Sequence, residues 1–203
     1  MRNTIRLAYD HLTKDKVMSF LIDKFRDKID WSNRYNSNYP LSIANLIIEQ
    51  QISFKAAITV KKRFAKIVDK KSQSEIMNMS NTDLQSIGIS FRKTEYIKNV
   101  FRFFKNKTID FDKMSDKEVI DCLVAIKGVG EWTAQMFLIF NLFRQDIFSP
   151  KDLALINSIK KNYLMESVGK VEIEKLTKKW APYNSIACPV SYTHLRAHET
   201  KAN

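Results

Sequence analysis

The chain is short of the residues on which several classes of protein depend. Its 203 residues include only two cysteines, Cys122 and Cys188, too few for a disulfide scaffold, a four-cysteine zinc site or an iron–sulfur cluster. Both lie in apolar helical contexts, so we expect buried free thiols. No apolar run approaches the roughly 18 residues of a membrane span, and the polar N-terminus is no signal peptide. These absences predict a cytosolic protein without membrane contact.

Glycine is scarce as well, and its placement is informative. Of four glycines, Gly128 and Gly130 stand one residue apart in AIKGVGEWTAQMF, between two apolar stretches with helical spacing. Glycine at both positions allows positive φ and the close approach of another group. The turn amides and the following helix N-terminus form an anion site. We expect a phosphate there, with Val129 pinning the turn into the core; a plain corner between two helices is the alternative.

Basic residues, in contrast, are abundant. Lysine and arginine number 34 against 22 acidic residues, a net charge of +12. A surplus of that size favours a polyanionic partner, most often nucleic acid. A solvated basic surface without any partner is the alternative interpretation.

The hydrophobic pattern is helical nearly throughout, and no convincing strand pair appears, which predicts an all-α protein. We expect Ser53 and Ser90 to open helices, Ser115 with Glu118 to form a capping box, and a short helix to end at Gly88. Roughly the first 35 residues should pack with the C-terminal helices, since neither end makes a full core alone. The expected longer helices cover 16–29, 41–50, 54–68, 91–104, 132–143, 153–164 and 171–180.

The last stretch, VSYTHLRAHET, departs in composition from a body rich in Lys, Ile, Asn and Phe. It resembles a translated sequencing-library adapter. We therefore expect residues 190–203 to be a foreign tail, and residues 1–189 to be the native domain, cut short at its C-terminus. A genuine histidine-containing tail is the alternative. His194 and His198 are accordingly not taken as metal ligands or catalytic bases.

A second motif stands in DIFSPKDLALINSI, where Asp152 follows Gly130 by 22 residues. A proline and an acid at a helix entrance can be a plain N-cap. Together, however, the GVG hairpin, the proline and this aspartate resemble the helix-hairpin-helix DNA glycosylase superfamily. Five stretches look like its 3-methyladenine DNA glycosylase II branch, in the same order: LSIANLIIEQQISFKAA, SIGISFRKTEYIKNV, IKGVGEWTAQMFLIF, DIFSPKDLAL and WAPYNSIAC. We expect a compact form that lacks the N-terminal β domain of some members.

The resemblance implies a helix-hairpin-helix glycosylase fold of two helical lobes, with the active site in the cleft between them. It implies a hydrolase of base excision repair that flips an alkylated purine, such as 3-methyladenine, out of damaged double-stranded DNA and hydrolyses its N-glycosidic bond. Asp152 matches the catalytic aspartate. Trp132 stands where lyase members carry a Schiff-base lysine, so no lyase activity is expected. The alternatives are a glycosylase for uracil or a deaminated purine, and a catalytically silent DNA-binding module.

The same resemblance assigns contacts to base and DNA. Trp132 and Met136 would line the base pocket, and Gln51 would be the wedge that fills the gap left by the flipped base. Phosphate would bind at Gly128, Gly130 and Thr133. Hairpin packing for Trp132 and a polar helix end for Gln51 are the alternatives. Arg92, Lys93 and Lys98 are candidate charges for positioning phosphate, or else solvated surface residues.

No cofactor is expected, and no metal held by side chains. The resemblance allows a structural Na⁺ or K⁺ on hairpin carbonyls near Gly128 and Gly130. We expect a monomer in the cytoplasm, associated with the nucleoid in a bacterium, or a nuclear protein in a eukaryote.

Overall fold

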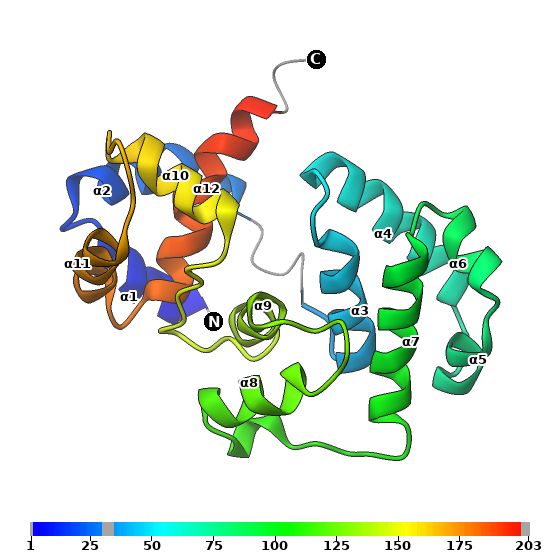
Figure 1. The fold of residues 1–203 in the computed structure, drawn as a ribbon. Coiled ribbons are helices and arrows are strands. Elements are labelled where there is room, and N and C mark those ends of the chain that lie inside the picture. Colours follow the sequence, from blue (N-terminus) through cyan, green and yellow to red (C-terminus); the bar gives the residue numbers. More distant parts are fainter. Residues whose placement is uncertain (1, 30–34, 200–203) are drawn as a thin grey trace. The chain divides into compact units, whose positions relative to one another are not determined.

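The computed structural model describes residues 2–29 and 35–199, which form helices and loops with no strand in these ranges (Figure 1). The all-α prediction is therefore confirmed. The chain divides into two compact units: residues 1–33 with 143–203, and residues 34–142. The expected packing of the N-terminal residues with the C-terminal helices is confirmed by the first unit. The predicted position of the active site between lobes stays a prediction.

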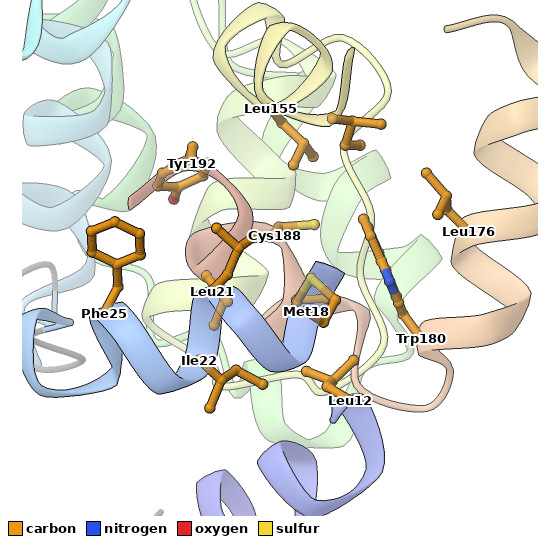
Figure 2. Close-up of a cluster of buried hydrophobic side chains, with 13 residues drawn as sticks. Leu12, Met18, Leu21, Ile22, Phe25, Leu155, Leu176, Trp180, Cys188 and Tyr192 are labelled. Atoms are coloured by element: carbon orange, nitrogen blue, oxygen red, sulfur yellow. The ribbon is translucent and has the colours of Figure 1, made fainter. Parts of the chain in front are cut away.

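The first unit is built from both ends of the chain. Its helices are α1 (Arg2–Leu12), α2 (Lys16–Phe25), the 3₁₀ turn η1 (Arg26–Lys28), α10 (Leu153–Asn162), α11 (Lys170–Trp180) and α12 (Asn184–Glu199). Figure 2 shows their buried side chains converging on one core. The core residues with the least exposure are Met18, Ile159, Trp180, Ala187 and Val190. Burial of such side chains is worth about 1.5–3 kcal/mol each, so the two chain ends stabilise one another.

A buried carboxylate links the α1–α2 corner to this core. Asp15 is only 3% exposed and caps α2 by accepting the amide hydrogens of Val17 and Met18. Its second oxygen accepts the Tyr163 hydroxyl at 2.9 Å and the Lys179 ammonium at 2.8 Å. Burial alone would raise the pKa of Asp15, but these donors outweigh it and the pKa lies below 3.8. The buried charge of Asp15 is tolerated because both of its carboxylate oxygens accept hydrogen bonds.

Helix α12 continues through Pro189 and beyond position 190 without a break. Val190, Ser191 and Tyr192 are buried, and the Ser191 carbonyl accepts Asn162 Nδ2 at 2.9 Å. The start of the predicted foreign tail therefore contributes to the first unit's core. Packing does not reveal the origin of a segment, so the tail remains a prediction; the His194 and His198 side chains lie outside the described part.

The second unit carries the hairpin predicted from the glycines. Its elements are α3 (Tyr39–Glu49), α4 (Phe54–Val68), α5 (Gln73–Asn78), α6 (Asn81–Ser86), α7 (Phe91–Phe104), η2 (Phe111–Lys113), α8 (Asp116–Val124) and α9 (Glu131–Phe140). The N-caps at Ser53 and Ser90 and the capping box of Ser115 with Glu118 are confirmed. Gly88, at φ +98°, ends the short α6 region as expected.

Helix α9 is buried at every position from Thr133 to Phe140. A helix that is apolar all round belongs inside a domain. Phe137 packs edge-to-face on Tyr39 and Phe111, with ring centroids 5.3 Å apart in both pairs. Such aromatic pairs add about 0.5–1.5 kcal/mol beyond their buried area. The hairpin that precedes α9 is therefore anchored to a buried, well-packed helix.

Several expected boundaries are wrong. Helix α2 ends at Phe25 rather than at position 29, and α9 ends at Phe140 rather than at 143. Helices α1 and α5 were not expected; α5 begins with a capping box at Ser72. Cys188 is buried as expected, whereas Cys122 is only half-buried, because the inward face of α8 is filled by other side chains. No helix in the described ranges has the length and hydropathy to cross a membrane.

Candidate functional site

The two hairpin glycines have different conformations. Gly128 has φ +105°, as expected for a position that needs glycine. Gly130 is extended, with φ −96° and ψ 175°, and serves as the N-cap of α9, so it does not use the positive φ that glycine allows. Val129 between them is 5% exposed and does pin the turn into the core. The conformation of the turn therefore requires glycine at position 128, but not at position 130.

The two glycines also differ in the space around them. A Cβ on Gly128 would lie 2.1 Å from Tyr96 Cγ, so α7 packs directly against this part of the turn. A Cβ on Gly130 would meet nothing within 4 Å, and Gly130 is exposed. The missing side chain at Gly130 is not required by any described atom of the protein. It leaves the backbone open to a group that approaches from outside.

The start of α9 next to Gly130 suits an anion. The first amides of a helix have no acceptor within the helix, and its N-terminal end carries a partial positive charge. Glu131, Trp132 and Thr133 contribute these amides. With the open backbone at Gly130, they form a donor-lined helix N-terminus of the kind that binds phosphate.

The hairpin carbonyls are tied to neighbouring helices by side-chain amides. Asn99 Nδ2 on α7 donates to the Lys127 carbonyl at 3.2 Å. Gln50 Nε2 donates to the Gly128 carbonyl at 3.2 Å and to Thr133 Oγ1 at 3.0 Å. Thr133 is 1% exposed, so its hydroxyl is turned inward and only its backbone amide is placed for phosphate. A cation on these carbonyls would share them with amide donors, and it remains a prediction.

The predicted wedge lies in the turn between α3 and α4. Gln51 is exposed and has φ +53°, a left-handed conformation that is uncommon for a residue with a side chain. Its neighbour Gln50 is the one bonded to the hairpin. The structure thus separates two adjacent glutamines whose sequence signals are the same: Gln50 faces inward and Gln51 faces outward.

Lys93 differs from its expected role as a phosphate-positioning charge. Its ammonium donates to the carbonyls of Ile48, at 2.9 Å, and Gln50. Figure 1 shows α7 running beside α3, which brings the two groups together. Burial lowers the pKa of Lys93 from 10.5. Lys98 likewise donates to Asn81 Oδ1, whereas Arg92 is exposed.

The two predicted pocket residues follow the hairpin on α9. Trp132 is half-buried in the first turn, and Met136 is 2% exposed one turn later. Residues four apart lie on the same helix face. Met136 therefore belongs mainly to the core, while Trp132 keeps part of its ring accessible.

Asp152 stands at the N-terminus of α10 in the first unit. Its Oδ1 accepts the Leu155 amide at 3.1 Å, so the N-cap interpretation is confirmed. The residue is 9% exposed, between exposed Lys151 and Leu153. The Cys188 thiol lies nearby, and both burial and the Asp152 charge raise its pKa. The cap holds the carboxylate in one direction at the end of a helix.

Metal binding by side chains finds no support in the described part of the chain. Within residues 2–29 and 35–199, no group of three or more His, Cys, Asp or Glu could hold an ion. The candidate functional features are a donor-lined hairpin, an outward glutamine turn and a capped, nearly buried aspartate.

Comparison with known proteins gives these features a context. The model of the HhH-GPD superfamily of base excision DNA repair proteins matches residues 44–182, which include the glutamine turn, the hairpin and Asp152. DNA-3-methyladenine glycosylase of Saccharomyces cerevisiae is 34% identical over 151 residues, 68% of this chain and 50% of the relative. DNA-3-methyladenine glycosylase 1 of Schizosaccharomyces pombe is 28% identical over 192 residues, 87% of this chain and 84% of the relative.

Solved structures agree on the fold. The structure of a 3-methyladenine DNA glycosylase of Schizosaccharomyces pombe in complex with abasic DNA matches with a TM-score of 0.82, 23% identity and coverage of 93% of this chain and 96% of that one. The chain nevertheless spans only about half the length of several curated relatives, namely 53%, 50% and 55%.

Proposed function

The chain belongs to the HhH-GPD superfamily of base excision DNA repair proteins, and on that premise we propose that it is a DNA glycosylase for alkylated purines. It binds damaged double-stranded DNA, receives a flipped base such as 3-methyladenine, and hydrolyses the N-glycosidic bond. The observation that carries the proposal is Asp152: a nearly buried carboxylate, held by a helix N-terminus, within the range that the family model matches. Curated relatives of both yeasts bear the name DNA-3-methyladenine glycosylase.

Hydrolysis of the N-glycosidic bond of an alkylated purine requires only one carboxylate. Glycoside hydrolysis ordinarily uses two, one of which protonates the leaving group. An alkylated purine such as 3-methyladenine already carries a positive charge and leaves without that proton. Asp152 then stabilises the cationic sugar of the transition state and orients water. Electrostatic stabilisation of this kind is worth about 3–4 kcal/mol, or a factor of 10²–10³ in rate.

DNA engagement is assigned to the second unit. A phosphate binds at Gly130 and the first amides of α9, where the backbone is open. Gln51 enters the duplex from the α3–α4 turn, and the accessible part of the Trp132 ring faces the cationic base, an interaction worth about 0.5–2 kcal/mol. Trp132 offers no amine for a Schiff base, so the reaction ends at the abasic site without strand cleavage.

The test is release of free 3-methyladenine from methylated duplex DNA, separated by chromatography without alkaline treatment. Asp152→Asn is the informative variant, because asparagine caps a helix as well as aspartate does but lacks the charge. We expect its release rate to fall about 10²–10³-fold, while Asp10→Asn, at an exposed position on α1, keeps the parent rate.

Three outcomes would contradict the proposal in different ways. Full activity in Asp152→Asn would refute the catalytic role of the carboxylate. Release of uracil or a deaminated purine in place of 3-methyladenine would move the substrate to another lesion. Binding of DNA by a folded protein that releases no base would identify a silent binding module.

A further inference from the structure

The α3–α4 turn holds an unfavourable backbone conformation at an exposed position. Gln51 has φ +53°, which residues with a Cβ avoid unless surrounding contacts impose it. Helix α3 ends at Glu49, and the Gln50 amide bonds back to the Ile47 carbonyl. The conformation of Gln51 is therefore set by whatever fixes the peptide between Gln50 and Gln51.

That peptide is held by Lys93 on α7. The Lys93 ammonium donates to the Gln50 carbonyl, the one that directly precedes Gln51, and to the Ile48 carbonyl at 2.9 Å. The last carbonyls of a helix have no partner within the helix, and a cation at that end also meets the negative end of the helix dipole. One side chain thus completes the end of α3 and fixes the first peptide of the turn.

The same glutamine is fixed at its other end. The Gln50 side-chain amide donates to the Gly128 carbonyl and to Thr133 Oγ1. Lys93, Gln50 and the hairpin therefore form one continuous hydrogen-bonded chain within the second unit. Through it, the direction in which Gln51 leaves the turn is set relative to the phosphate-binding surface at Gly130.

We propose that Lys93 is a positioning residue, which holds the Gln50 carbonyl so that Gln51 is presented to the duplex in register with the hairpin. The proposal rests on the proposed function, in which Gln51 acts as the wedge. Lys93 contacts no DNA; its effect on base release passes entirely through the turn. This assignment differs from that of a surface lysine that binds phosphate, and the two make opposite predictions.

The first experiment needs no enzymatic activity. Lys93→Met keeps the aliphatic stem and removes the donor, and Lys93→Arg restores donors at the same place. Hydrogen exchange of the amides at 47–50, which are hydrogen-bonded in the last turn of α3, should become about tenfold faster in Lys93→Met and return toward the parent rate in Lys93→Arg. Lys113→Met, which removes an exposed ammonium paired with Asp110 in the same unit, controls for charge. Unchanged exchange at 47–50 in Lys93→Met overturns the proposal.

The second experiment asks whether the effect passes through Gln51. Base release by Lys93→Met should fall about 10–10²-fold, with unchanged affinity for undamaged duplex. In a Gln51→Ala background, Lys93→Met should not lower the rate of base release any further, because the effects of residues that act as a unit are not additive. Additive losses overturn the proposal, as does weaker binding of undamaged duplex with a salt slope reduced by about one, the mark of a phosphate contact.

Failure of the two ideas is distinguishable. A parent protein that releases no base contradicts the proposed function, and hydrogen exchange at 47–50 then still decides whether Lys93 holds the end of α3 and the turn. Should Lys93→Met fail to fold, Lys93→Arg and Lys93→Gln, which retain donors of different reach, should show graded exchange at 47–50. Equal exchange in both variants and the parent overturns the proposal.

Discussion

The hairpin offers a sharp comparison, since alanine at Gly128 and at Gly130 should have opposite consequences. At Gly128 the new Cβ would lie 2.1 Å from Tyr96 Cγ and 2.4 Å from Tyr96 Cβ. These atoms are the rigid base of the tyrosine side chain, so the ring cannot swing away from the clash. The backbone at φ +105° is also unfavourable for alanine. At Gly130 neither problem arises.

The magnitudes follow from these two terms. A left-handed conformation costs alanine about 1–2 kcal/mol, and overpacking a well-filled site costs about 1–3 kcal/mol. Gly128→Ala should therefore lower the free energy of unfolding by about 2–5 kcal/mol. Gly130→Ala gains from a stiffer unfolded chain and loses a little as an N-cap, so it should stay within about 1 kcal/mol of the parent.

Urea unfolding followed by far-ultraviolet circular dichroism measures both variants, with the midpoints compared at equal slopes. The reasoning is refuted if Gly130→Ala destabilises as much as Gly128→Ala, or if Gly128→Ala is neutral. A second measurement separates folding from function: Gly130→Ala should bind duplex DNA about tenfold more weakly despite its stability, since its methyl group projects where the phosphate must approach. Unaltered binding would contradict the assignment of phosphate to this turn.

Three further substitutions test the packing and capping of the two units. Asp15→Asn should lower the free energy of unfolding by about 1–3 kcal/mol at neutral pH. The lowered pKa of Asp15 contributes stability that is present above about pH 4 and lost as the pH falls through the folded-state pKa, so the difference between variant and parent in urea unfolding should shrink at acid pH; a constant difference would contradict this. Phe137→Ala should lower the free energy of unfolding by about 3–5 kcal/mol, whereas Phe91→Ala, at an exposed position, should lower it only slightly. Equal shifts in the thermal midpoint of the two variants would contradict a stabilising role for the buried aromatic cluster. Ser115→Ala should lower the free energy of unfolding by about 0.5–2 kcal/mol in the same unfolding measurement, whereas Ser74→Ala within α5 should leave it unchanged. An unchanged free energy of unfolding in Ser115→Ala would show that the capping box does not stabilise the protein.

The features that sequence reasoning predicts well are local ones. A serine cap acts on amides two or three residues away, so Ser53, Ser90 and Ser115 are recognised from spacing alone and confirmed. The helix end at Gly88 is predicted for the same reason, and the glycine there has the positive φ typical of a helix C-terminus. The packing of both chain ends into one unit also follows from sequence, since neither end has enough apolar surface alone.

Features that depend on distant segments are predicted poorly. Nothing near Lys93 in the sequence indicates that its ammonium will meet carbonyls of α3 more than forty positions earlier. Likewise, Gly128 and Gly130 look equivalent until Tyr96 is placed against one of them. The short α5 is not predicted by hydrophobic periodicity because its apolar content is small, although Ser72 and Glu75 have the spacing of a capping box.

Asp152 shows why a correct structural interpretation does not displace a functional one. Its Oδ1 caps α10, yet a cap alone gives no reason for an acid, since asparagine and serine serve equally well. A catalytic carboxylate, in turn, must stay charged and point in a fixed direction. The N-terminal end of a helix favours negative charge, and the hydrogen bond to the Leu155 amide restricts the side chain. The cap is therefore a means of holding the carboxylate ready, and the two roles are separated only by a substitution that keeps the first and removes the second.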